Sequence, residues 1–121
     1  MSTPKIFESE YRFCLILWEH EPVGSTELVR LCADQLGWSK ATTYTVIRRL
    51  CERGVVKNEN AVVMSLVSQE EAQVSEIDEL VEKRFGGSMP SFIAALSRKR
   101  KLTQQQAEEI MRIIDSAGEE D

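Results

Sequence analysis

The spacing of apolar residues along the chain changes twice, and this order limits the folds open to it. Between residues 8 and 53 apolar side chains recur at helical intervals in three stretches. After Gly54 the chain continues in short β-branched runs, VVK and AVVMSLV, separated by NEN. From Ser68 onward the helical spacing returns in three further stretches. The predicted order is therefore three helices, a hairpin of two strands, and three helices.

Capping residues set the expected helix boundaries. We expect the helices at residues 8–20, about 26–36, about 40–53, about 69–85, about 89–97 and about 104–117. Ser9 and Ser39 are the predicted N-caps of the first and third helices, and Gly37 is expected to end the second.

The C-terminal half carries its own boundary signals. Ser68 with Glu71 and Thr103 with Gln106 have the spacing of capping boxes. The SRKRK segment at residues 97–101 is predicted to be a loop, and we expect the terminal GEED to fray.

This order predicts a mostly α fold, a winged helix-turn-helix followed by a three-helix segment. We expect residues 1–67 to form the DNA-binding domain and residues 68–121 to form a helical dimerisation domain. The second part has wide apolar stripes, but roughly 50 residues rarely make a sufficient core alone. Pairing with a second copy buries those stripes, so the sequence predicts a homodimer.

Composition and charge fit a cytoplasmic protein with one focused basic surface. The chain has 121 residues and a net charge of −5. No apolar run approaches the roughly 20 residues that span a bilayer, and the start MSTPKIFESE has no signal-peptide core. Residues 38–57 nevertheless carry five positive side chains against Glu52 alone.

The third predicted helix, SKATTYTVIRRLCERG, separates a buried stripe from a basic, hydroxyl-rich face. The stripe is Thr43, Val46, Ile47 and Leu50. A helix of this kind enters the major groove of DNA, where base edges are distinguishable. Threonines approach bases or phosphates, a tyrosine packs on a thymine methyl or bonds a phosphate, and arginines contact phosphates or guanine. The candidate DNA-binding residues are Ser39, Lys40, Thr42, Tyr44, Thr45, Arg48 and Arg49.

The predicted wing differs from a wing that binds DNA strongly. Its tip, Asn58-Glu59-Asn60, is short and acidic, whereas a basic tip is suited to flanking phosphates. Either the wing contacts DNA weakly or it has another task. A winged-helix module that binds a protein and no DNA is therefore the alternative from another functional class.

The sequence contains no residue pattern typical of a catalytic or metal-binding site. Cys14, Cys32 and Cys51 form no CxxC pair and are expected to be buried thiols. A thiol-redox regulator, acting through Cys51 in the third helix, is the second alternative. The single histidine, His20, is predicted to cap a helix C-terminus. We therefore predict no enzyme activity, no metal, no cofactor and no small-molecule substrate.

Two segments resemble the penicillinase-repressor family, the BlaI/MecI-type regulators. In SEYRFCLILWEHEPVGSTELVRLCADQLGWSKATTYTVIRRLCERGVV the positions that fit the family pattern are Glu10, Trp18, Glu27, Leu28, Trp38, Ser39, Thr42, Thr45, Arg49, Leu50 and Gly54. FGGSMPSFIAAL, at residues 85–96, resembles the junction in the family's dimerisation part.

The resemblance implies a dimeric winged-helix repressor that binds an inverted-repeat operator of double-stranded DNA. It also implies relief of repression by proteolysis, triggered by a membrane-bound sensor metallopeptidase. By position, the bond cleaved in β-lactam-responsive members corresponds to Ala95–Leu96, where those members have Asn-Phe.

Overall fold

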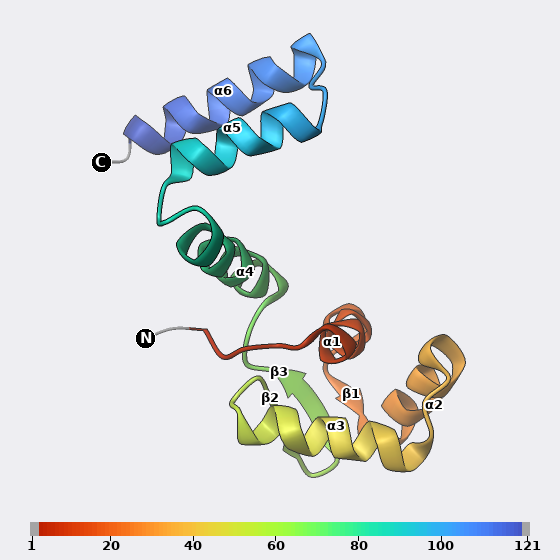
Figure 1. The fold of residues 1–121 in the computed structure, drawn as a ribbon. Coiled ribbons are helices and arrows are strands. Elements are labelled where there is room, and N and C mark those ends of the chain that lie inside the picture. The colour runs from red at the N-terminus through yellow and green to blue at the C-terminus, as the bar shows by residue number, and fades with distance from the viewer. Residues whose placement is uncertain (1–2, 120–121) are drawn as a thin grey trace. The chain divides into compact units, whose positions relative to one another are not determined.

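The structure is a computed structural model that describes residues 3–119 (Figure 1). Two compact packing units divide the chain, the first ending at Asp78 and the second beginning at Glu79. The elements are α1 (Glu8–His20), β1 (Val23–Gly24), α2 (Ser25–Leu36), α3 (Lys40–Glu52), β2 (Val56–Glu59), β3 (Val62–Ser65), α4 (Gln69–Arg84), α5 (Met89–Lys99) and α6 (Gln104–Glu119). The predicted winged-helix order of helices and hairpin, followed by three helices, is confirmed. The functional boundary between residues 67 and 68 stays a prediction.

The N-terminal helices begin and end close to the predicted residues, with one wrong cap. The N-cap of α1 is Phe7, whose N–H donates to Glu10 Oε1 at 2.9 Å, and the predicted cap Ser9 lies inside the first turn. A glutamate at the third helical position reaches back to this N–H, so no hydroxyl is needed there. Gly37 ends α2 with φ 71°, as predicted. Ser39 caps α3, accepting a hydrogen bond from the N–H of Thr42 at 3.1 Å.

A three-stranded antiparallel sheet in the order β1-β3-β2 forms the wing. The sequence predicted two strands and missed β1, because two residues show no periodicity. The predicted tip was also misplaced: Asn58 and Glu59 belong to β2 and pair with β3. The turn is Asn60-Ala61, both with positive φ (53° and 62°), as a two-residue hairpin turn of the primed type requires.

The core of the first unit lies among α1, α2, α3 and the sheet. Its fully buried side chains include Phe13, Leu17, Leu28, Leu50 and Val63. The predicted buried stripe of α3 is confirmed, since all four of its residues are buried. This packing fixes the rotation of α3 about its own axis and therefore decides which face the helix presents outward.

The three C-terminal helices begin at the predicted residues; α4 ends one residue before its predicted end, and α5 and α6 each run two residues past theirs. Both predicted capping boxes form, with hydrogen bonds of 3.0–3.1 Å. Helix α5 continues to Lys99, so part of the predicted SRKRK loop is helical, because lysine and arginine favour a helix and suit its C-terminal end. Helix α6 includes Gly118 and Glu119 of the expected frayed tail, and the last two residues lie outside the described range.

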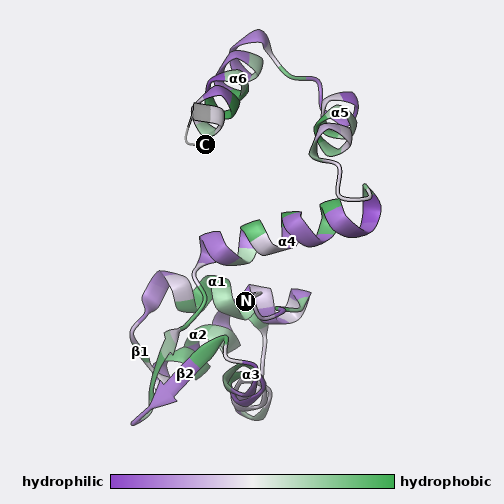
Figure 2. Ribbon diagram, turned by 90° about the vertical axis from the view of Figure 1, so that its left-hand side faces the viewer, coloured by the Kyte–Doolittle hydropathy of each residue, from purple (hydrophilic) through white to green (hydrophobic). Residues whose placement is uncertain are grey.

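Many apolar side chains of the C-terminal helices are exposed. No residue of α5 is buried. Figure 2 shows hydrophobic and hydrophilic colours alternating along α5 and α6. The exposed large apolar residues of the second unit are Leu80, Met89, Leu96, Leu102, Met111, Ile113 and Ile114. Within residues 3–119, no helix has both the length and the apolar character that crossing a membrane requires.

Candidate nucleic-acid interface

The outward face of α3 carries the residues predicted to contact DNA. Lys40, Thr42, Arg48 and Arg49 are exposed, and the predicted N-cap Ser39 is exposed at the start of the helix. Tyr44 and Thr45 lie on the same outward side but are half-buried. The structure thus brings all seven predicted site residues onto one helix and its cap (Figure 1).

The hydroxyl of Thr42 is oriented by the helix cap. Ser39 Oγ accepts the hydrogen bond from the N–H of Thr42 and donates its own proton to Thr42 Oγ1 at 3.0 Å. Thr42 therefore accepts from the cap, and its own hydroxyl proton is available to an acceptor outside the protein. Phosphate oxygens and several base-edge atoms are such acceptors.

The two exposed arginines of α3 differ in their surroundings. Arg48 Nε lies 4.0 Å from Glu52 Oε1, and both side chains are 68% exposed, so solvent screens this pair strongly. Arg49 is exposed on the adjacent side of the helix. Both guanidinium groups are thus accessible for the forked hydrogen bonds that arginine makes to phosphate or guanine.

Arg53, which contributed to the basic count of residues 38–57, is used inside the protein. Its guanidinium pairs with the buried carboxylate of Glu10, and its Nη1 donates to the carbonyl of Lys5 at 2.8 Å. It also lies 5.2 Å from the ring centroid of Phe7. Sequence reasoning missed this role because the partners lie more than forty residues away.

Ser25 connects α3 to the wing turn through two hydrogen bonds. It is the first residue of α2 and is only 5% exposed. Its N–H donates to the carbonyl of Ala61 in the wing turn at 2.8 Å. Its Oγ accepts a hydrogen bond from the hydroxyl of Tyr44 at 3.3 Å. No pattern in the sequence indicated this contact, because three separate segments meet there.

The outer face of the wing is mixed in character. Val62 and Met64 are 40% and 36% exposed, and they pair with Glu59 and Lys57 of β2. Figure 2 shows the end of β2 near the turn in hydrophilic colours. Glu59, the acidic residue that the sequence placed at the wing tip, lies in β2 next to the turn, where it pairs with Val62.

The cysteines do not provide a reactive thiolate. Burial raises the pKa of the Cys14 thiol to about 12 and that of Cys32 to about 11. Cys51 is half-buried, and burial raises its pKa as well. Because the thiolate is the reactive form, these environments disfavour a redox switch. Among the residues that the structure describes, no cluster of three metal-ligating side chains occurs.

The proteolytic-switch residues and the predicted histidine cap belong to helices other than α3. Ala95 and Leu96 are within α5, with Ala95 half-buried and Leu96 39% exposed. His20 is exposed at the end of α1, and its Nδ1 donates to the carbonyl of Ile16 at 2.9 Å, in agreement with the predicted cap.

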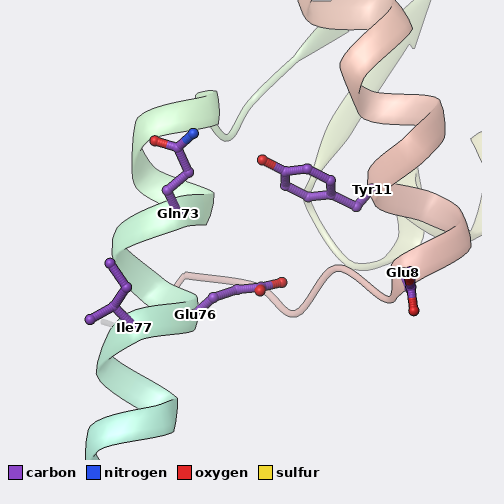
Figure 3. A pocket seen from close by; sticks show the side chains of 5 residues that line it. All are labelled: Glu8, Tyr11, Gln73, Glu76 and Ile77. Carbon is purple, nitrogen blue, oxygen red and sulfur yellow. The ribbon is translucent and has the colours of Figure 1, made fainter. Parts of the chain in front are cut away.

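A pocket lies between α1 and the first part of α4. Tyr11 points from α1 toward the helix that carries Gln73, Glu76 and Ile77, and Glu8 completes the lining (Figure 3). Both carboxylates are exposed, and no buried polar side-chain atom of the described residues lacks a hydrogen-bond partner. The pocket therefore offers no fixed, desolvated polar group that selects a ligand.

Comparison with known proteins identifies the family to which this winged-helix chain belongs. The sequence profile of the penicillinase repressor matches residues 6–116. The chain belongs to the penicillinase-repressor family. The methicillin resistance regulatory protein MecI of Staphylococcus aureus strain Mu50 is 25% identical over 117 residues, covering 93% of this chain and 95% of that relative. The penicillinase repressor of Bacillus licheniformis is 19% identical over 116 residues, covering 93% and 91%.

Among solved structures, Staphylococcus aureus MarR in complex with salicylate and kanamycin aligns with a TM-score of 0.46 and 16% identity. The alignment covers 94% of this chain and 72% of that one. Membership of the penicillinase-repressor family makes this chain a winged-helix transcriptional repressor and not an enzyme, as the sequence predicted.

Proposed function

We propose that this penicillinase-repressor protein binds an inverted-repeat operator as a homodimer and recognises it with α3 in the major groove. The exposed basic and hydroxyl face of α3 carries the proposal. The buried stripe on the opposite side anchors the helix, so this face is held outward in a fixed orientation. In this role the protein acts inside the cell, where the operator is.

Each side chain of the face is suited to one kind of contact. Thr42 and Thr45 are short enough to approach base edges closely. Lys40, next to the N-cap Ser39, and the pair Arg48 and Arg49 supply positive charge to phosphates, and one arginine is free to fork onto guanine.

The exposed apolar residues of the C-terminal helices support the homodimer. Met111, Ile113 and Ile114 expose 55%, 67% and 45% of their surface in α6. A second copy of the same segment offers matching apolar surface, and a closed two-fold pair is the commonest way to bury it. We therefore assign dimerisation to residues 68–121 and DNA binding to residues 1–67.

Fluorescence anisotropy tests the DNA-binding proposal. The probe is a labelled duplex of about 30 base pairs from upstream of the protein's own gene, with a scrambled duplex of equal length as reference. Arg49→Ala is expected to weaken binding and to lower the salt slope by about one, the loss of one phosphate contact. Arg112→Ala, which removes an exposed arginine of α6, is the matched control.

Two results contradict this proposal. Unchanged affinity of Arg49→Ala at moderate salt overturns the role of that residue. Negligible binding of both duplexes by the folded wild-type protein overturns DNA recognition and favours the protein-interaction module.

Sedimentation velocity tests the homodimer. Ile113→Asp places a charge on the exposed apolar face of α6 and is expected to dissociate the dimer to monomers at micromolar concentration. Ser116→Asp adds the same charge at an exposed polar position of α6 and is expected to leave the dimer intact. A dimer that survives Ile113→Asp contradicts the assignment of this face.

Release of the operator is proposed to follow cleavage at Ala95–Leu96 by a membrane-bound sensor metallopeptidase. The bond lies inside α5, so α5 must open locally before a protease can bind it as an extended segment. Cleavage there separates α6 from the winged helix. Mass spectrometry of the protein from induced cells tests this, and an intact chain in derepressed cells contradicts it.

A further inference from the structure

The ring of Tyr44 is held in one orientation at the edge of the recognition face. Tyr44 lies one helical turn after Lys40, and its half-buried ring packs against the core. Its hydroxyl donates to Ser25 Oγ at 3.3 Å. Ser25 is itself fixed, because it is buried and its N–H donates to the wing turn.

This hydrogen bond decides which chemistry Tyr44 offers to DNA. A phenol has one proton, and the proton of Tyr44 is donated to Ser25. Phosphate oxygens only accept hydrogen bonds, so a tyrosine without a free proton makes a poor phosphate ligand. What Tyr44 still presents is the apolar part of its ring.

We propose that Tyr44 recognises a thymine through its 5-methyl group and that Ser25 is the positioning residue for this contact. Thymine alone presents a methyl group in the major groove, so an apolar ring there distinguishes it from the other bases. The inference rests on the proposed function and adds one base preference to it.

Deoxyuridine substitution tests the contact, because uracil differs from thymine only by the missing methyl. In the upstream duplex that the wild-type protein binds, each thymine is replaced in turn by deoxyuridine. We expect one position in a half-site to lose about fourfold in affinity, the value of one buried methyl group. The other thymines are internal controls. Tyr44→Ala is expected to bind the thymine and uracil duplexes equally.

The role of Ser25 needs a readout that a general structural defect does not change. We compare the thymine-to-uracil affinity ratio of Ser25→Ala, Tyr44→Phe and the double variant. Each single variant loses the same hydrogen bond, so both are expected to reduce the ratio, and the double variant is expected to match the singles. Tyr44→Phe keeps the ring and tests the bond independently of any folding defect in Ser25→Ala.

Three outcomes overturn the inference. If Tyr44→Ala keeps the full thymine preference, Tyr44 makes no methyl contact. If Tyr44→Phe weakens both duplexes equally and leaves the ratio unchanged, the hydroxyl binds phosphate. If Ser25→Ala and Tyr44→Phe keep the wild-type ratio while Tyr44→Ala loses it, Ser25 does not position the ring. Failure of the wild-type protein to bind any duplex refutes the proposed function itself and is recognised before these comparisons.

Discussion

Arg49 and Arg53 lie one helical turn apart, yet replacing each with alanine is expected to affect a different property of the protein. Arg49 is exposed on the outward face of α3, whereas Arg53 caps the C-terminus of α3 and binds the N-terminal segment. Arg53→Ala is expected to destabilise the fold. Arg49→Ala is expected to weaken DNA binding and leave the stability unchanged.

The contacts of Arg53 determine how much stability Arg53→Ala is expected to lose. Its partner Glu10 is 8% exposed, and breaking a buried ion pair by removing one partner costs about 3–5 kcal/mol. The hydrogen bond to the carbonyl of Lys5 and the contact with Phe7 are lost as well. Because 29% of the Arg53 side chain is exposed, solvent screens part of the pair, and we expect a total loss of about 3 kcal/mol. For exposed Arg49 we expect a change within about 0.5 kcal/mol.

Urea unfolding followed by circular dichroism at pH 7 measures both variants at one protein concentration, because the proposed dimerisation makes stability concentration-dependent. With a slope of about 2 kcal/mol per molar urea, the midpoint of Arg53→Ala shifts down by about 1.5 M. Anisotropy on the operator duplex is then measured well below both midpoints. A midpoint of Arg53→Ala within 0.3 M (roughly 0.6 kcal/mol at that slope) of wild type refutes the reasoning, as does an equal loss in Arg49→Ala.

Three further predictions concern single features of the first unit. Glu52→Gln removes the carboxylate beside Arg48 and is expected to tighten operator binding severalfold at low salt; unchanged affinity in the anisotropy assay contradicts this. Ala61→Gly relieves the positive φ in the wing turn and is expected to raise stability by about 0.5–1 kcal/mol, and a lower thermal midpoint contradicts it. The raised pKa values of Cys14 and Cys32 mean that the unfolded thiols ionise first, near 9.0, so the free energy of unfolding should fall as pH rises from about 9 to 11. A Cys14→Ala variant with an unchanged alkaline slope contradicts the last prediction.

Local signals predicted most of the helices and the face of α3. Ser39 and Gly37 act on neighbouring residues, so their roles can be inferred from sequence alone. Two local predictions were wrong, because neighbouring residues offered alternative positions for a helix cap and for a turn. Phe7 and not Ser9 is the N-cap of α1, because Glu10 accepts the N–H of Phe7, and the hairpin turn lies at Asn60-Ala61 and not over the whole of NEN.

Distant contacts decided what the sequence left open about the candidate site. The partners of Arg53 and Ser25 lie far from them in the chain, and no periodicity relates such pairs. In the folded protein Arg53 is paired with Glu10 and does not belong to the exposed basic surface. The hydroxyl of Tyr44 donates its hydrogen bond to Ser25.

The amino-acid sequence by itself determined the order of elements, the buried side of α3 and the family resemblance, because each depends on spacing within a short stretch or on an ordered set of residues. Only the tertiary structure decided which charged and polar groups remain available to DNA. That availability depends on which segments meet in space. Hydrogen bonds and ion pairs between segments more than forty residues apart involve charged groups, such as that of Arg53, whose partners cannot be inferred from the sequence alone.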